Sequence, residues 1–205
     1  VQPDQPLTVP KLMEVMRDHY EGTEFDLTTK PAFQTAQGLS PLAAPWGPPE
    51  LHDLLGLKPE RAIGTPTSGY VFVAQLRTNL PPAIANLLWF AYGPADTSCF
   101  IPLYAGTTNL PDTWDQPANF TRIDRQQAQW NFRLVHNLAH RLAYQMVMPE
   151  VQAMLKPAER QYLTLQADLE QAAVGVFRTA GAEAGEAFLT AYASDCARAA
   201  GFAYC

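Results

Sequence analysis

The chain has 205 residues, 47% of them hydrophobic, and a formal net charge of −6 at neutral pH. This length and composition allow a sizeable core, so we expect residues 1–205 to form a single domain or a contiguous fragment of one. The negative charge excludes non-specific nucleic-acid binding, which needs a positive surface to displace counterions. No apolar run approaches the roughly 20 residues that cross a bilayer, so we expect no membrane partner.

The first predicted element is a short helix. Thr8 can cap it, Pro10 suits its first turn, and apolar residues recur on one face to about Tyr20. Residues 28–50 are rich in proline and glycine, which predicts a long loop. A short helix over residues 49–55 follows this loop.

Three β-branched or aromatic runs predict antiparallel strands between about residues 69 and 104. The runs are Tyr70–Leu76, Leu87–Tyr92 and Ser98–Tyr104. Pro102 cannot donate a hydrogen bond to a neighbouring strand, which favours an edge position or a strand end for the third run.

Helical spacing dominates from about residue 124 to residue 203. Asp124 can cap a first helix, Pro149 is expected to end or kink it, and Pro157 to begin a second. Gly181 separates the second helix from a third. The apolar positions that keep helical spacing in the first helix are Trp130, Leu134, Leu138, Leu142 and Met146. The predicted fold class is therefore α+β, with antiparallel strands followed by a helical C-terminal region.

A metal site is the first kind of chemistry to consider. His136 and His140 are spaced i, i+4 and share a helix face, a geometry that can hold zinc. Asn137 stands where a metalloprotease helix carries glutamate, and no third ligand is evident. We therefore interpret these three residues as lining a helix–helix contact, and we expect no metal and no cofactor.

The three cysteines, Cys99, Cys196 and Cys205, lack metal-binding spacing. Cys99 could pair with a histidine as a nucleophile, but it lies in an apolar strand pattern. Burial there would raise its pKa and leave little thiolate, so we interpret Cys99 as a core residue. Cys196 and Cys205 could form a disulfide in an oxidising compartment or could remain thiols.

Four segments of the chain have the pattern of a known family and occur in the same order as in that family. They are Met16–Leu27, Ser68–Arg77, Leu88–Gly106 and Trp130–Arg141. Together they resemble the latter part of the C69 dipeptidases, which are N-terminal-nucleophile hydrolases. The resemblance implies an αββα fold, in which two antiparallel sheets lie between helical layers. It also implies a mature amino-terminal cysteine that attacks the scissile carbonyl, with its own α-amino group as general base.

This chain departs from the family pattern at its start, Val1-Gln2-Pro3, and at Pro66, where the family often has arginine. We therefore expect the C-terminal part of a cysteine-type dipeptidase whose nucleophile lies outside this chain. The alternative is a non-catalytic structural or binding module related to that family. A secreted or periplasmic location is expected, with the cytoplasm as the alternative.

The expected partners are a dipeptide substrate and the missing N-terminal half of the same protein. Half of a sandwich would also expose an apolar sheet face, and large exposed apolar patches promote association. We therefore expect the isolated chain to form homo-oligomers, to aggregate, or to copurify with its missing half.

A dense polar run over residues 17–26 suits a binding site, because it lies between a helix and a proline-rich loop. A carboxylate there could hold the amino group of a dipeptide, and an arginine its carboxylate. We predict no catalytic residue in this chain and four substrate-binding residues, Arg17, Glu21, Asp26 and Arg77. The alternative is that the run satisfies the backbone groups of the helix end and the loop.

Overall fold

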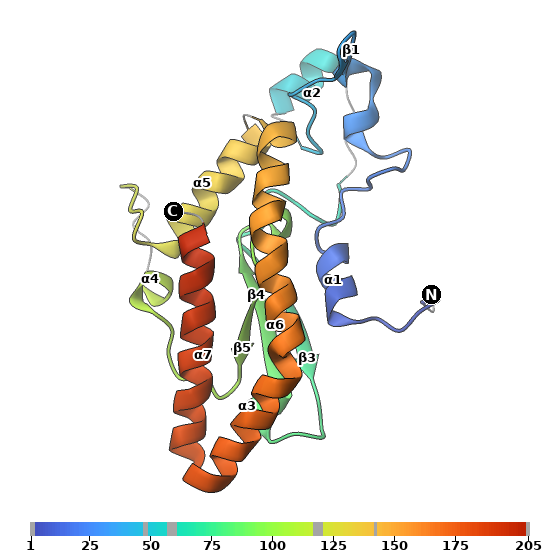
Figure 1. The fold of residues 1–205 in the computed structure, drawn as a ribbon. Helices are drawn as coiled ribbons and strands as arrows, with labels where there is room; N and C mark the ends of the chain where they lie inside the picture. Colours follow the sequence, from blue (N-terminus) through green and yellow to red (C-terminus); the bar gives the residue numbers. More distant parts are fainter. Residues whose placement is uncertain (1–2, 47–48, 57–60, 117–120, 142, 204–205) are drawn as a thin grey trace.

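The computed structural model describes residues 3–46, 49–56, 61–116, 121–141 and 143–203 (Figure 1). The α-helices are α1 (Val9–Val15), α2 (Pro49–Leu55), α3 (Pro82–Ala85), α4 (Asp112–Asp115), α5 (Ala128–Arg141), α6 (Tyr144–Ala180) and α7 (Ala182–Ala203). Short 3-10 helices are η1 (Leu27–Thr29), η2 (Pro31–Phe33) and η3 (Ala95–Thr97). The strands are β1 (Gln34–Thr35), β2 (Gly38–Leu39), β3 (Tyr70–Leu76), β4 (Asn86–Tyr92) and β5 (Ile101–Tyr104). The predicted α+β class, with a helical C-terminal region, is confirmed.

Helix α1 begins where the sequence predicts and ends earlier. The backbone N–H of Lys11 donates to Thr8 Oγ1 at 3.3 Å, so Thr8 is the cap. The helix ends at Val15 rather than near Tyr20. Tyr20 has a φ of +65°, in the left-handed region, and its N–H donates to Asp18 Oδ1 at 2.6 Å. These local contacts form a turn and prevent the helix from continuing.

The segment predicted as a long loop contains more structure than expected. It begins with η1 and η2, and the short antiparallel hairpin of β1 and β2 follows. Leu27, Phe33 and Ala43 are buried together and form a small core of their own. The predicted helix at residues 49–55 is confirmed as α2.

The main sheet is antiparallel, with strand order β3-β4-β5. Val73 pairs with Trp89, and Trp89 pairs with Pro102. Within the described residues β5 has β4 as its one neighbour, so the edge position predicted from Pro102 is confirmed. Strand β5 begins at Ile101, later than predicted, because the turn through η3 takes up the preceding residues.

The two faces of this sheet differ in burial. Figure 1 shows α6 and α7 crossing one face, where Trp89 is completely buried. On the opposite face, Tyr70, Phe72 and Leu76 are 61%, 48% and 75% exposed. Tyr70 stacks on Phe90 there, with ring centroids 5.9 Å apart. The β3 side of the sheet therefore presents apolar side chains that nothing in the described part of the chain covers.

The sequence predicts that Pro149 ends or kinks a helix and that Pro157 begins the next. Neither proline marks a helix boundary, so the predicted helix start at Pro157 is wrong. Helix α6 begins at Tyr144 and contains both prolines. Each internal proline removes one helical hydrogen bond and costs about 3 kcal/mol or more. Both prolines are exposed, so the affected turns lie on the solvent side, while Val151 and Leu155 bury the opposite side. Burial of that side offsets the cost and keeps the helix continuous.

The predicted apolar stripe of α5 is not its buried face. Leu134 and Leu138 are exposed, whereas Phe132, His136 and His140 are buried. Leu142 lies outside the described residues. The break before Gly181 is confirmed, since this glycine has a φ of +90° between α6 and α7. No helix in the described ranges is long and apolar enough to cross a membrane.

Candidate functional site

The polar run after α1 forms a tight turn against the core. Besides the bond from Tyr20 to Asp18, the backbone N–H of His19 donates to Glu21 Oε2 at 2.9 Å. Asp18 also holds the next part of the chain, because its carbonyl accepts from the N–H of Gly64 at 2.9 Å. These contacts fix the backbone on both sides of His19 and direct its side chain inward. We call residues 18–23 the His19 turn.

The imidazole of His19 lies between two carboxylates. Its Nδ1 is 3.1 Å from Glu21 Oε1, and its Nε2 is 3.4 Å from Asp96 Oδ2. The His19 side chain is only 2% exposed, while that of Glu21 is 62% exposed. His140 Nε2 lies 2.7 Å from the same Asp96 oxygen. Asp96 in η3 therefore connects the His19 turn to helix α5.

Aromatic rings and a glycine enclose the same imidazole. The ring centroids of Trp46, His140 and Tyr144 each lie 6.4 Å from that of His19. Trp46 Nε1 donates to the carbonyl of Gly64 at 3.0 Å. A Cβ added at Gly64 would lie 2.9 Å from His19 Nε2, so a glycine is required for this approach. Water is largely excluded from the ring.

The electrostatics of this cluster favour an ionised Asp96. Burial alone would raise the pKa of Asp96, but the hydrogen bond and charge of His140, and the charges of His19 and His136, hold it below its ordinary value. Burial, with the nearby His140, lowers the pKa of His136 to about 4. Burial also raises the pKa of Tyr144, and the charge of Asp96 adds to this rise. At neutral pH the cluster thus contains a carboxylate, a neutral His136 and a protonated Tyr144.

Three polar atoms of the cluster have no hydrogen-bond partner among the described residues. They are Asp96 Oδ1, His136 Nδ1 and His140 Nδ1. Buried polar atoms are usually paired with protein or with water. Asp96 also borders a small cavity of about 30 Å³ beside Arg17 and Glu159, which is large enough for one water molecule.

A polar groove of about 430 Å³ opens beside the cluster. His19 and Asp96 lie in its lining together with Arg17 and Glu21. Groups of both signs line the groove, which suits a ligand that carries both charges. The other charged residues of the lining are Lys11, Glu14, Asp18 and Lys156.

The structure brings the predicted residues Arg17 and Glu21 to this groove, but Arg17 also serves the fold. Its Nη1 donates to Glu159 Oε2 at 2.9 Å, and Nη2 pairs with the other oxygen of the same carboxylate. Its Nε donates to the carbonyl of Ala95 at 2.7 Å, and Nη2 to that of Ser98 at 3.0 Å. The guanidinium is thus occupied by α6 and the η3 region.

The structure does not bring Arg77 to the groove. Its Nη1 donates to Glu170 Oε2 at 2.7 Å, and its other nitrogens donate to the carbonyls of Ile84 and Ala85. Glu170 lies about three turns, roughly 16 Å, along α6 from Glu159. The two predicted arginines therefore contact α6 at two positions about three turns apart.

Asp26 completes the turn that follows the His19 turn. Its carboxylate accepts from the N–H groups of Gly22 at 3.0 Å and Thr28 at 2.9 Å, and from Thr28 Oγ1 at 2.6 Å. Burial raises the pKa of Asp26, but these hydrogen bonds outweigh it and hold the pKa below its ordinary value. The carboxylate is therefore engaged as the cap of η1.

The cysteines and the histidine pair provide no nucleophile or metal site in the described residues. Cys99 is buried, which confirms its interpretation as core, and burial together with the charge of Glu159 raises its pKa. Burial also raises the pKa of Cys196 to about 12. Cys205, and with it the alternative of a disulfide to Cys196, lies outside the described residues. No group of three or more potential ligands is arranged for a metal ion in the ranges described.

The predicted contact at His136, Asn137 and His140 needs a correction. Both histidines are buried, but Asn137 is exposed because it points away from that face of α5. His140 contacts Asp96 in η3 rather than another helix. The histidines thus line a helix–turn contact, and Asn137 takes no part in it.

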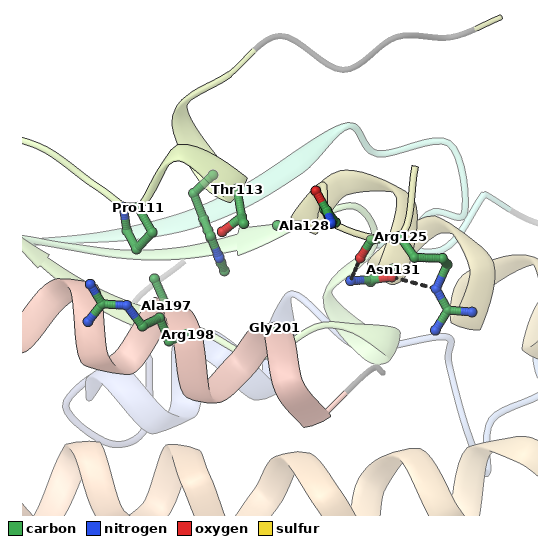
Figure 2. Close-up of a pocket in the computed structure, with 10 residues that line it drawn as sticks. Pro111, Thr113, Arg125, Ala128, Asn131, Ala197, Arg198 and Gly201 are labelled. Carbon is green, nitrogen blue, oxygen red and sulfur yellow. Dashed lines mark hydrogen bonds between the residues drawn. The ribbon is translucent and has the colours of Figure 1, made fainter. Parts of the chain in front are cut away.

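A second pocket, of about 430 Å³, lies between α4, the start of α5 and the end of α7 (Figure 2). Trp114, Ala128 and Ala197 give it apolar walls. Figure 2 shows Arg125 held by the buried Asn131, with Nε donating to Oδ1 at 2.8 Å. The described residues that line it include no acid, histidine or cysteine. The polar groove is therefore the better candidate for chemistry.

Sequence reasoning missed the centre of the cluster. His19 was part of the polar run but not of the predicted substrate-binding set, and Asp96 was not considered. One signal was available, since Asp96 follows strand β4 and the Gly93-Pro94 turn, where functional side chains are common. Its pairing with His140, 44 residues away, depends on tertiary structure.

Known proteins match this chain at the level of a family. The sequence profile of peptidase family C69 matches residues 1–157. Dipeptidase A of Lactobacillus helveticus is 30% identical over 86 residues, which are 38% of this chain and 18% of that protein. A dipeptidase of Bifidobacterium longum (strain NCC 2705) is 24% identical over 134 residues, which are 65% of this chain and 21% of that protein. The match spans about a fifth of the length of these curated relatives. Since the family profile covers most of its residues, the chain belongs to peptidase family C69.

Proposed function

We propose that this chain provides the scaffold and part of the substrate groove of a dipeptidase, and that the nucleophile lies on polypeptide outside these residues. The observation that carries the proposal is the family match over residues 1–157, in a chain whose described cysteines are both buried. The two relatives described above are named as dipeptidases, which supports a dipeptide as substrate.

The proposed reaction is acyl transfer to an amino-terminal cysteine. The α-amino group takes the thiol proton, the thiolate attacks the peptide carbonyl, and the C–N bond breaks as the leaving amine receives that proton. Water then hydrolyses the thioester and releases the acyl group as a carboxylic acid. No step in this scheme uses a titratable side chain of the present chain as the nucleophile or base.

The polar groove supports binding of a dipeptide. A free dipeptide is a zwitterion at neutral pH, and the groove is lined by lysines as well as carboxylates. Glu21 is the predicted residue best placed to accept the ammonium group, because its carboxylate is mostly exposed while it still bonds to His19. Lys156 is the proposed partner of the substrate carboxylate. Arg17 then positions the groove wall through Glu159.

The uncovered sheet face supports the proposed division between two parts of one protein. Tyr70, Phe72 and Leu76 form an apolar surface on β3. We propose that this surface packs against the second sheet of the family's αββα sandwich, contributed by the rest of the parent protein. Burial of such side chains stabilises by about 1.5–3 kcal/mol each, which would hold the two parts together.

Dipeptide hydrolysis by the isolated chain and by the full-length parent tests the proposal. The parent is expected to be active, its variant with the mature amino-terminal cysteine changed to alanine inactive, and the isolated chain inactive. Turnover by the isolated chain at the rate of the parent would refute the proposed location of the nucleophile. A parent reading frame without a processable cysteine would favour the non-catalytic module instead.

A further inference from the structure

We propose that the pocket between α4, the start of α5 and the end of α7 binds an apolar carboxylic acid, with the carboxylate at Arg125 and the apolar body against Trp114. We call it the Trp114 pocket. Its described lining residues and those of the polar groove have no member in common. The inference therefore concerns a separate site, and it does not depend on the proposed dipeptidase function.

The size and the walls of the Trp114 pocket suit a small organic molecule. Its volume of about 430 Å³ lies within the roughly 300–1,000 Å³ that is usual for small-molecule sites. Trp114, Ala128 and Ala197 supply apolar walls from three helices, and the two alanines are small enough to leave space between α5 and α7. An aromatic or branched apolar ligand would be shielded from water between these walls.

The wall at Trp114 is fixed by the core behind it. Trp114 is only 6% exposed, and its ring centroid lies 4.9 Å from that of Tyr92 and 5.6 Å from that of Phe132. The hydroxyl of Tyr92 donates to the carbonyl of Trp114 at 3.0 Å. Because this wall is already ordered, a ligand that packs on it pays little ordering entropy.

The indole N–H of Trp114 gives a second, independent indication of a ligand. Its Nε1 lies toward α7, 3.9 Å from the position that a Cβ on Gly201 would take, and both residues line the pocket. No described residue accepts a hydrogen bond from this N–H. A buried tryptophan N–H usually has a partner, so a ligand that carries an acceptor, such as an amide carbonyl, would complete the site.

The charges around the pocket favour an anion over a cation. Arg125 and Arg198 line it, and the described lining residues include no acid. Figure 2 shows these two arginine side chains on opposite sides of the pocket. The pocket also includes Ala128, the first residue of α5, and the N-terminal end of a helix carries a partial positive charge.

Arg125 is the arginine assigned to the carboxylate. Its Nε donates to Asn131 Oδ1 at 2.8 Å, and Asn131 Nδ2 donates to the carbonyl of Arg125 at 2.8 Å. Because Asn131 is buried, this reciprocal contact fixes the direction of the guanidinium, and a neutral amide does not cancel its charge. Arg198 instead pairs with the carboxylate of Asp195 at 2.9 Å, in an exposed ion pair that neutralises it.

Titration of the full chain with N-acetyl-phenylalanine tests the inference. This probe combines a carboxylate, an apolar ring and an amide carbonyl. We expect saturable binding with a Kd of about 1 mM or below, and a shift of the Trp114 indole N–H signal in NMR spectra of 15N-labelled protein. The Trp114→Phe variant assigns that signal. N-acetyl-phenylalaninamide lacks the negative charge and should bind at least about tenfold more weakly.

Two matched pairs of variants locate the site. Arg125→Gln should weaken binding of the acid about tenfold, whereas Arg198→Gln removes the same charge on the opposite side and should weaken binding less than about threefold. Gly201→Leu places a side chain beside Trp114 Nε1 and should abolish the shift. Gly175→Leu, at a position of α6 where a Cβ meets nothing within 4 Å, should leave binding unchanged.

Circular dichroism checks that each variant is folded. If Gly201→Leu does not fold, the two arginine variants and the uncharged probe still test the site. The absence of a saturable shift of the Trp114 signal in the unmodified chain would overturn the proposal. Equal affinity for the acid and its amide, or an unchanged affinity in Arg125→Gln, would do the same.

Discussion

Arg17 and Glu159 form a partly buried ion pair between the segment just after α1 and the middle of α6, across 142 residues of sequence. The same carboxylate accepts the backbone N–H of Phe100 at 2.8 Å. Arg17 in turn donates to the carbonyls of Ala95 and Ser98. One pair of side chains thus joins the first helix, the turn before β5 and the long C-terminal helix.

Breaking this pair from one side should be costly. In Glu159→Gln, the guanidinium of Arg17 would lose its counter-ion in a partly buried site, and such losses cost about 3–5 kcal/mol. Urea denaturation of the chain should show this drop in the free energy of unfolding. Glu150→Gln, at an exposed position of α6, is the control and should change stability by less than about 0.5 kcal/mol.

The double replacement of Arg17→Met with Glu159→Leu should lose less free energy of unfolding than the single variant, because no charge is left unpaired. Equal stability of Glu159→Gln and the unmodified chain would contradict the assignment.

Stability should fall in mildly acidic solution because of His136. Its pKa is lowered from 6.5 to about 4 in the folded chain, chiefly by burial. As pH falls below 6.5 the unfolded chain takes up a proton that folded His136 does not, so unfolding becomes more favourable until about pH 4. The loss over this window should be roughly 3 kcal/mol.

The His136→Phe variant should show a flatter stability profile across this window. The contribution of Asp96 is separable, because its folded pKa lies below 3.8 and its stabilisation is lost only in more acidic solution. Denaturation midpoints measured at a series of pH values check both effects. An unchanged slope in His136→Phe would show that another group titrates in this window.

Gly64→Ala should disturb the enclosure of His19. The new Cβ would lie 2.9 Å from His19 Nε2 and 3.1 Å from the carbonyl carbon of Arg17, and the backbone cannot easily move away. Overpacking of this kind costs about 1–3 kcal/mol, and we expect faster amide exchange in the His19 turn. Gly69→Ala is the matched control, since a Cβ there meets nothing within 4 Å. Equal stabilities of the two variants would argue against tight packing around His19.

Charges on the uncovered sheet face should reduce self-association of the isolated chain. Phe72 and Leu76 are exposed on β3, so Phe72→Glu and Leu76→Glu should leave the fold intact while they disrupt an apolar contact surface. Light scattering at high concentration should show association of the unmodified chain and its loss in the double variant. Circular dichroism serves as the control for folding. A monomeric unmodified chain would contradict the prediction.

The elements that could be predicted are those specified by residues close together in the sequence. The β-branched and aromatic residues of Tyr70–Leu76 specify a strand by themselves, and Thr8 before Pro10 specifies a capped helix start. Gly181 ends α6 because a φ of +90° suits glycine. Each of these signals needs no information from distant parts of the chain.

The errors arose where distant contacts decide the outcome. Helix α6 continues through Pro149 because its opposite side is buried, which no local pattern around the proline reveals. His136 and His140 lie on the buried face of α5, and the leucines lie on its exposed face. This orientation brings His140 into contact with Asp96, which is distant in the sequence. The candidate site was predictable as a polar run, but its central contact, between His19 and Asp96, was not.

The two acids that pair with Arg17 and Arg77 lie beyond residue 157, where the family match ends. A protein trimmed at that border would retain two inward-facing guanidinium groups and lose Glu159 and Glu170, the carboxylates that neutralise them. The helical hairpin of α6 and α7 is therefore an integral half of the folding unit rather than an appendage. Any minimal version of this protein must extend at least through Glu170.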